Sequence, residues 1–497
     1  MSEQSDQVPR FKIQRFKQFV AEDENYFLKR VADIGLNPNK DFIGADLGGL
    51  NLSGLNLSGF NFSGANLCNS NLRGTFLSGA DLSRTNLNGS SLQRANLNKA
   101  NLNNADISNA NLGGANLRGA QLNQSMLRAT RLISADFRNA NLAEAVLDKA
   151  LIRQADFRGA QLNKASLKGA NLIGVDLSHA KLVDADLQEA IVKRSSLVRT
   201  DLTRAKFYRA DLSYCNLSSA QLEEAVLIEA ILFAVNLSEV VLLRTNFNGA
   251  DLRNANLSNT YMRQANFDSC RLDGANLSNA NLSGVSLFNA SLQRAYLNAT
   301  NLIGANLQQA DLSNANLSAA DLRNADLRGI DLSQATVTGG QFAGCLGLTE
   351  IFQHELSDRG AVFTEFPVSL GFSSSDLGLR LLDLEDSSLR LKIYTHRLQT
   401  ALERVRNSDD AEISLAANLT RCDDIEQLVE QLFISCNNSN LEILEFRTSL
   451  EELTWTSQEL TDGYGDINDE LCKIGYFIRI VQAILVDLPG FIRRGSS

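Results

Sequence analysis

Histidine and cysteine are the side chains most able to bind metals or act as nucleophiles, and this sequence keeps its histidines apart. The three histidines are His179, His354 and His396. His354-Glu355 begins like the zinc-binding helix motif H-E-x-x-H, but Asp358 stands where the second histidine is needed. The sequence therefore predicts no metal site.

The cysteines also lack a functional spacing. Seven are scattered along the chain without a C-x-x-C pair: Cys68, Cys215, Cys270, Cys345, Cys422, Cys436 and Cys472. An odd number without pattern is typical of a reduced protein, so we expect a cytoplasmic location. The sequence also lacks a phosphate-binding P-loop and a G-x-S-x-G nucleophile motif. We therefore predict no catalytic residues, no cofactor and no enzymatic activity.

The carboxylates recur because the sequence repeats. From Ala45 to Gly344 the chain consists of a five-residue unit, such as Ala80-Asp81-Leu82-Ser83-Arg84, in a single frame. Dividing these residues by five gives about 60 copies. Asp alternates with Asn at the second position, which indicates a structural role rather than an acid–base pair.

A period of five fits neither the 3.6-residue period of a helix nor the two-residue period of a simple strand. In each copy a small residue and a large apolar residue stand two positions apart, on the same side of an extended segment. Cys215 and Cys270 occupy the small position, so we expect both to be packing residues. The residue between them points the other way, and the last two residues suit a turn. Four such corners close a coil of about 20 residues with a leucine-lined interior. About 15 coils at the ~4.8 Å spacing of paired strands predict a rod about 70 Å long.

The repeated A-(D/N)-L-x-x unit resembles the pentapeptide-repeat family, particularly its long cyanobacterial-type members. The resemblance implies a mainly β fold, a right-handed quadrilateral β-helix. It also suggests a signalling, developmental or assembly protein that acts by binding other proteins. Some family members instead mimic DNA and bind or protect type II topoisomerases.

We predict four parts of the chain. Residues 1–40 form an N-terminal helical cap, 41–345 the β-helix, 346–375 a C-terminal cap and linker, and 376–497 an acidic α-helical bundle. Thr349 is expected to cap a short helix that ends near Asp358, before Gly360. No apolar run is long enough for a membrane span, so none is predicted.

The charge is unevenly distributed along the chain. The chain has a formal net charge of −10. Residues 45–344 hold 27 basic and 24 acidic residues, or about +3, whereas 345–497 hold 13 basic and 26 acidic residues. A DNA mimic needs a strongly negative rod, so the charge disfavours the topoisomerase alternative.

One coil differs from the polar exterior of the rest. The six apolar residues at its outward positions are Val226, Ile228, Ile231, Phe233, Val241 and Leu243. We call these six the apolar belt, and the 20-residue period spreads them over three contiguous faces. The belt predicts an interface with a partner protein or with a second copy of the chain.

Basic residues gather in the coils just before the belt. They are Lys193, Arg194, Arg199, Arg204, Lys206 and Arg209, which we call the basic ring. Such a ring could hold nucleic acid or an acidic protein surface. Interleaved acidic residues and few aromatics favour a solvated face instead, so we expect no direct nucleic-acid binding.

Overall fold

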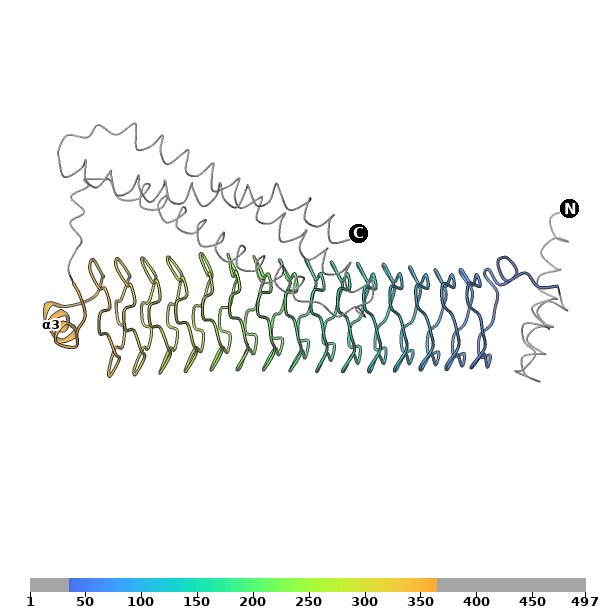
Figure 1. Cartoon of the computed structure of the whole chain (residues 1–497), viewed down its shortest axis with the longest axis horizontal. Helices are drawn as coiled ribbons and strands as arrows, with labels where there is room; N and C mark the ends of the chain where they lie inside the picture. The colour runs from blue at the N-terminus through green and yellow to red at the C-terminus, as the bar shows by residue number, and fades with distance from the viewer. Residues whose placement is uncertain (1–34, 364–497) are drawn as a thin grey trace, which may run out of the picture. The chain divides into compact units, whose positions relative to one another are not determined.

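A computed structural model describes residues 35–363, which form a stack of coils followed by a short helix (Figure 1). Parallel bridges join each second-position residue to the residue 20 positions later. Asp46, for example, pairs with Asn66, and Asn51 pairs with Asn71. The predicted 20-residue coil is therefore confirmed.

Four columns of bridges run along the stack and define four faces. We number them by their residues in one coil: face 1 contains Asn101, face 2 Asp106, face 3 Asn111 and face 4 Asn116. Within residues 35–363 the extended structure consists of single bridging residues, the first at Asp46 and the last at Val362. A residue on a face therefore lies beside the residues 20 positions before and after it in the sequence, which occupy the same face of the two adjacent coils.

Backbone hydrogen bonds between coils fix which side chains point inward. The Leu82 amide donates to the Asn101 carbonyl at 2.6 Å, and the Asn101 amide donates to the Ala80 carbonyl at 2.9 Å. Residues such as Ala80 and Leu82 are fully buried, whereas the bridging residue Asp81 is only partly buried. The alternation predicted from the five-residue unit is confirmed.

Each corner is a tight turn whose second central residue lies in the left-handed region. At one corner the Thr85 amide donates to the Leu82 carbonyl at 3.2 Å, and Arg84 has a φ of 56°. Glycine adopts this conformation without strain, as Gly74 does with a φ of 64°. The fifth position of the unit therefore often carries Gly or Asn, while a larger residue there must accept some strain.

The core is a ladder of stacked side chains. Phe137 packs on Phe157 with ring centroids 4.5 Å apart. Several polar inward residues donate to the preceding coil: the Thr75 hydroxyl, for example, donates to the Leu52 carbonyl at 2.8 Å. The Cys215 thiol donates to a carbonyl in the same way and is 1% exposed. The prediction that Cys215 is a packing residue is confirmed.

The helix α3, Glu350–Asp358, follows the coils. The Thr349 side chain accepts a hydrogen bond from the Phe352 amide, so the predicted cap and helix are confirmed. Gly360 then turns the chain with a φ of 88°, and Val362 pairs with Gln341. After the helix, the Arg359 guanidinium donates to the carbonyls of Leu332 and Ala335, which occupies backbone acceptors near the end of the stack.

The remaining predicted elements lie outside the described residues. These are most of the N-terminal cap predicted at 1–40, the linker after residue 363 and the helical bundle predicted at 376–497. Within residues 35–363, no helix has the length and apolar character that crossing a membrane requires.

Candidate functional site

The apolar belt lies on three faces of one coil, as the period predicted. Val226 and Ile228 lie on face 2, where Val226 pairs with Lys206. Ile231 and Phe233 lie on face 3, and Val241 and Leu243 lie on face 1. All six side chains occupy outward positions of their repeats.

The belt residues differ in how much surface they present. Ile231 is 42% exposed, whereas Val241 is only 8% exposed. The other four are half-buried. Tyr261, one coil further along face 1, is fully buried. Face 3 therefore presents the more accessible part of the belt.

Aromatic and arginine side chains extend the belt along face 3. Phe233 meets Tyr214 edge to face, with centroids 5.5 Å apart. The Arg194 guanidinium lies 5.9 Å from the centre of the Tyr214 ring, and Arg253 lies 5.7 Å from that of Phe233. These contacts join four successive coils into one column, in which two arginines flank two aromatic rings. Tyr214 is 54% exposed.

Three of the six residues of the basic ring are paired with carboxylates on neighbouring coils. Lys193 pairs with Asp211 at 2.7 Å. Burial alone would raise the pKa of Asp211, but hydrogen bonds from Lys193 and Ser213 outweigh it and lower this pKa. Arg204 pairs with Asp184 at 2.7 Å, and its hydrogen bond lowers the pKa of that carboxyl. This pairing agrees with the predicted solvated face.

One more ring residue is paired in the same way. Arg209 pairs with Glu229 at 2.6 Å and also lies over the Tyr208 ring at 4.8 Å. Arg194 differs, because its guanidinium lies over the Tyr214 ring. Half of the ring is therefore neutralised by carboxylates.

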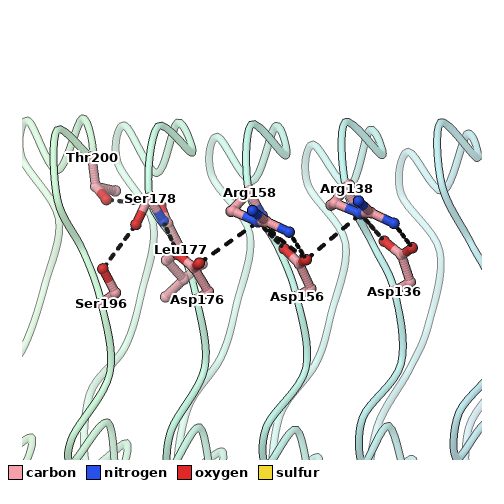
Figure 2. Close-up of polar contacts among 9 residues, drawn as sticks. All are labelled: Asp136, Arg138, Asp156, Arg158, Asp176, Leu177, Ser178, Ser196 and Thr200. Atoms are coloured by element: carbon pink, nitrogen blue, oxygen red, sulfur yellow. Dashed lines mark hydrogen bonds and ion pairs between the residues drawn. The ribbon is translucent and has the colours of Figure 1, made fainter. Parts of the chain in front are cut away.

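Face 4 carries a chain of alternating Asp and Arg residues (Figure 2). Arg138 forms a 2.6 Å ion pair with Asp136 and reaches Asp156 on the next coil at 3.6 Å. Arg158 repeats both contacts with Asp156 and Asp176 at 2.6 and 3.6 Å. These charges satisfy one another, so the ladder links coils rather than forming a reactive site.

The ladder predicts how stability depends on pH. Burial alone would raise the pKa of Asp136, but hydrogen bonds from Arg138 outweigh it and lower this pKa. A carboxyl with a lowered pKa stabilises the fold above its unfolded pKa of about 3.9, and this contribution is lost as pH falls through the folded pKa. We expect Asp136→Asn to reduce the free energy of unfolding by about 0.5–1 kcal/mol at pH 7.

The difference should close as the pH approaches 2, which urea unfolding followed by circular dichroism can measure. Asp331→Asn is the control, because within residues 35–363 Asp331 has no Lys or Arg at ion-pair distance. An Asp136→Asn effect that does not change with pH would contradict the electrostatic account.

Within 35–363, no three His, Cys, Asp or Glu side chains gather where they could hold a metal ion. Burial raises the pKa of Cys215 and Cys270 to about 12, so these thiols stay protonated. His396 lies outside the described residues.

The coils and their outward surfaces define a class of protein: a parallel β-helix with four faces, which presents side chains on a regular repeating frame. The family model described as pentapeptide repeats (8 copies) matches residues 45–178 and 180–339. The chain therefore belongs to the pentapeptide-repeat family, and its fold is the right-handed quadrilateral β-helix of that family.

Solved structures of the family are similar to this chain. One is HetL, a pentapeptide repeat protein involved in heterocyst differentiation regulation in Nostoc sp. strain PCC 7120, which is 25% identical to this chain. The match covers 66% of this chain and 100% of HetL, with a TM-score of 0.12. A protein from the Arabidopsis thaliana thylakoid lumen is 28% identical over 23% of this chain and 79% of its own, with a TM-score of 0.22.

Rfr23 from the cyanobacterium Cyanothece 51142 is 41% identical, with a TM-score of 0.15. The match covers 19% of this chain, which spans about 62% of the length of Rfr23. No curated protein matches the chain.

Sequence reasoning missed one feature of face 3. The basic ring was defined by residues close together along the chain, whereas neighbours on a face stand 20 residues apart. When the outward residues of face 3 are followed at this spacing, a second set of arginines appears in the coils before the belt. The signal was present in the sequence but becomes visible only when each face is followed separately.

Proposed function

We propose that this protein is a non-catalytic interaction scaffold or regulatory protein that binds partner proteins through the apolar belt. The observation that carries the proposal is the interruption of a polar exterior by apolar residues on three contiguous faces of one coil. Contiguous exposed apolar surface rimmed by polar residues is typical of protein interfaces. The partner is another protein or a second copy of the chain, in the reducing compartment expected from the cysteines.

Three features of face 3 support a protein partner. Ile231 and Tyr214 provide exposed apolar surface. Arg194 and Arg253 hold the aromatic rings from either side. Tyrosine, phenylalanine and arginine are enriched in protein interfaces, where they supply much of the binding energy. The regular hydrogen bonding between coils keeps these groups in a fixed arrangement before a partner arrives, which lowers the entropic cost of binding.

The alternative function, imitation of DNA toward a type II topoisomerase, lacks this support. Its physical requirement is a surface that repeats the negative charge of a duplex. Residues 45–344 instead carry about +3, and many of their carboxylates are paired with arginine or lysine. We therefore keep the interaction scaffold as the proposed function.

Exchanging two belt residues for charged ones tests the proposal. We expect Phe233→Arg plus Leu243→Glu to lose at least 90% of captured partner protein and any self-association. The reason is that two charges would be desolvated at the centre of the interface, a cost of several kcal/mol. Affinity capture from the native cell with mass spectrometry, and light scattering for self-association, measure the two effects.

Phe288→Arg plus Ile303→Glu is the matched control. It makes the same kind of change at outward apolar positions away from the belt, where Phe288 is 42% exposed. The control should keep every partner, and both variants should retain the wild-type circular dichroism spectrum. Should all partners and self-association survive the belt variant, the belt is not the interface.

A further inference from the structure

Face 3 divides into a basic part and a part of mixed charge. From Asn51 to Arg194 its outward positions carry six basic and no acidic residues: Arg73, Arg94, Arg131, Arg153, Lys193 and Arg194. Acidic residues begin at Asp211 and recur at later coils, for example at Asp251 and Asp311. The basic part is thus a one-sided stretch of surface, not a random scatter of charge.

Two arginines of this part differ from the arginines of face 4 in their ion pairs. On face 4, Arg138 and Arg158 each form a 2.6 Å ion pair within the ladder. Within residues 35–363, by contrast, no carboxylate lies within 4.0 Å of the guanidinium of Arg131 or Arg153. Both side chains are exposed. Their charges are therefore available to a ligand.

Apolar side chains lie between these charges. Ile133 and Leu151 are half-buried, as is Ile173, and Ile191 is 37% exposed. We define the face-3 strip by eight residues: Arg131, Ile133, Leu151, Arg153, Ile173, Ile191, Lys193 and Arg194.

Bridges place the strip on four successive coils. Arg131 pairs with Leu151, Leu151 with Asn171, and Asn171 with Ile191. At ~4.8 Å per coil the strip is about 14 Å long, the span of four to five extended residues. It is long enough to contact a short peptide segment.

We propose that the face-3 strip binds a protein segment in which acidic side chains alternate with aliphatic ones. Exposed guanidinium groups can each take a carboxylate in a two-bond pair, and the isoleucines and Leu151 cover the aliphatic groups between them. The strip goes beyond the apolar belt, because it occupies earlier coils and selects its partner by charge as well as apolar contact. The two surfaces can therefore be tested separately.

The composition of the strip favours a protein over the other polyanions. Single-stranded nucleic acid binds where aromatic side chains stack on bases, and the strip has none. The isoleucine and leucine side chains between the cations would also find no apolar group to contact on a phosphate backbone. Anionic membranes attract clusters of lysine and arginine. Here the one lysine of the strip, Lys193, is already paired with Asp211 at 2.7 Å.

Fluorescence anisotropy with the full chain tests the strip. The probe is a labelled peptide with six alternating Glu and Leu residues between Gly-Ser ends. Peptides with Lys in place of Glu, or Ser in place of Leu, serve as comparisons. We expect the Glu/Leu peptide to bind at least tenfold more tightly than either, with affinity that falls as salt rises.

Two variants test whether the Glu/Leu peptide binds at the strip. Arg131→Glu plus Arg153→Glu should weaken binding of the Glu/Leu peptide at least tenfold. Arg84→Glu plus Arg294→Glu makes the same change of net charge at exposed arginines outside the strip and should leave binding within twofold of wild type. Equal losses in both variants would show attraction to overall charge and overturn the proposal.

Further outcomes would also overturn it. One is equal affinity for the Glu/Ser and Glu/Leu peptides, since the apolar residues would then have no role. Another is tighter binding of a single-stranded oligonucleotide, or of vesicles with anionic phospholipid, that is lost in the Arg131→Glu plus Arg153→Glu variant. Phe233→Arg plus Leu243→Glu should leave peptide binding unchanged, so failure of the belt and failure of the strip give different results.

Discussion

Deleting one residue of the β-helix will destabilise it more than deleting 20. We expect loss of Asn111 alone to reduce the free energy of unfolding by about 3–5 kcal/mol. Deletion of residues 101–120, a complete coil, should shift the unfolding temperature by only a few degrees, because repeat stability is a sum over similar neighbouring units. Thermal and urea unfolding of the full chain, followed by circular dichroism, measure both changes.

The physical reason is the register between coils. Deleting 101–120 joins Ala100 to Gln121, so the unit continues as Ala-Gln-Leu and every later residue keeps its face. Deleting Asn111 places Leu112 directly after Ala110, in the position that bridges the neighbouring coils. Either the leucine, which is fully buried, turns outward or the bridges of that coil break.

A control variant distinguishes the effect of losing the Asn111 side chain from the effect of losing the whole residue. Asn111→Ala removes the same amide but keeps the frame, and it should cost less than about 1 kcal/mol because its site is at the surface. If the single deletion unfolded at the wild-type temperature, the coil would not depend on a strict period of 20 residues.

Truncating a stacked phenylalanine should have the second large effect. Phe157 is 1% exposed and lies 4.5 Å from Phe137, centroid to centroid, in a ladder with little room to rearrange. We expect Phe157→Ala to cost about 3–5 kcal/mol, since it removes buried apolar surface and leaves a cavity that the fixed coils cannot close. Urea unfolding measures the change.

Phe76→Ala is the matched control for this substitution. Phe76 occupies a bridging position on face 4 and is 50% exposed, so its truncation should cost less than about 1 kcal/mol. Similar costs for the two substitutions would mean that the interior is not the rigid, stacked ladder on which a fixed binding surface depends.

Much of the fold could be predicted from the five-residue unit. In each unit, two apolar positions stand two residues apart, and two turn residues follow them. This spacing required the coil, and it required Leu82 and Ala80 to point inward. The same frame identified Cys215 as a packing residue. Thr349 and Gly360 marked the limits of α3, because a capping side chain and a left-handed turn are local properties. These features depend on neighbours in sequence, so the sequence alone determined them.

The surface depended on neighbours 20 residues away and on the rotamers they allow. Val241 and Ile231 occupy equivalent outward positions, yet one is 8% and the other 42% exposed. Arg138 turns onto Asp136 and Asp156, whereas Arg131 meets no carboxylate within the described part of the chain. The 20-residue period determines which face a residue occupies. Only the tertiary structure decides its partner and its exposure, because a flexible side chain chooses among groups on adjacent coils.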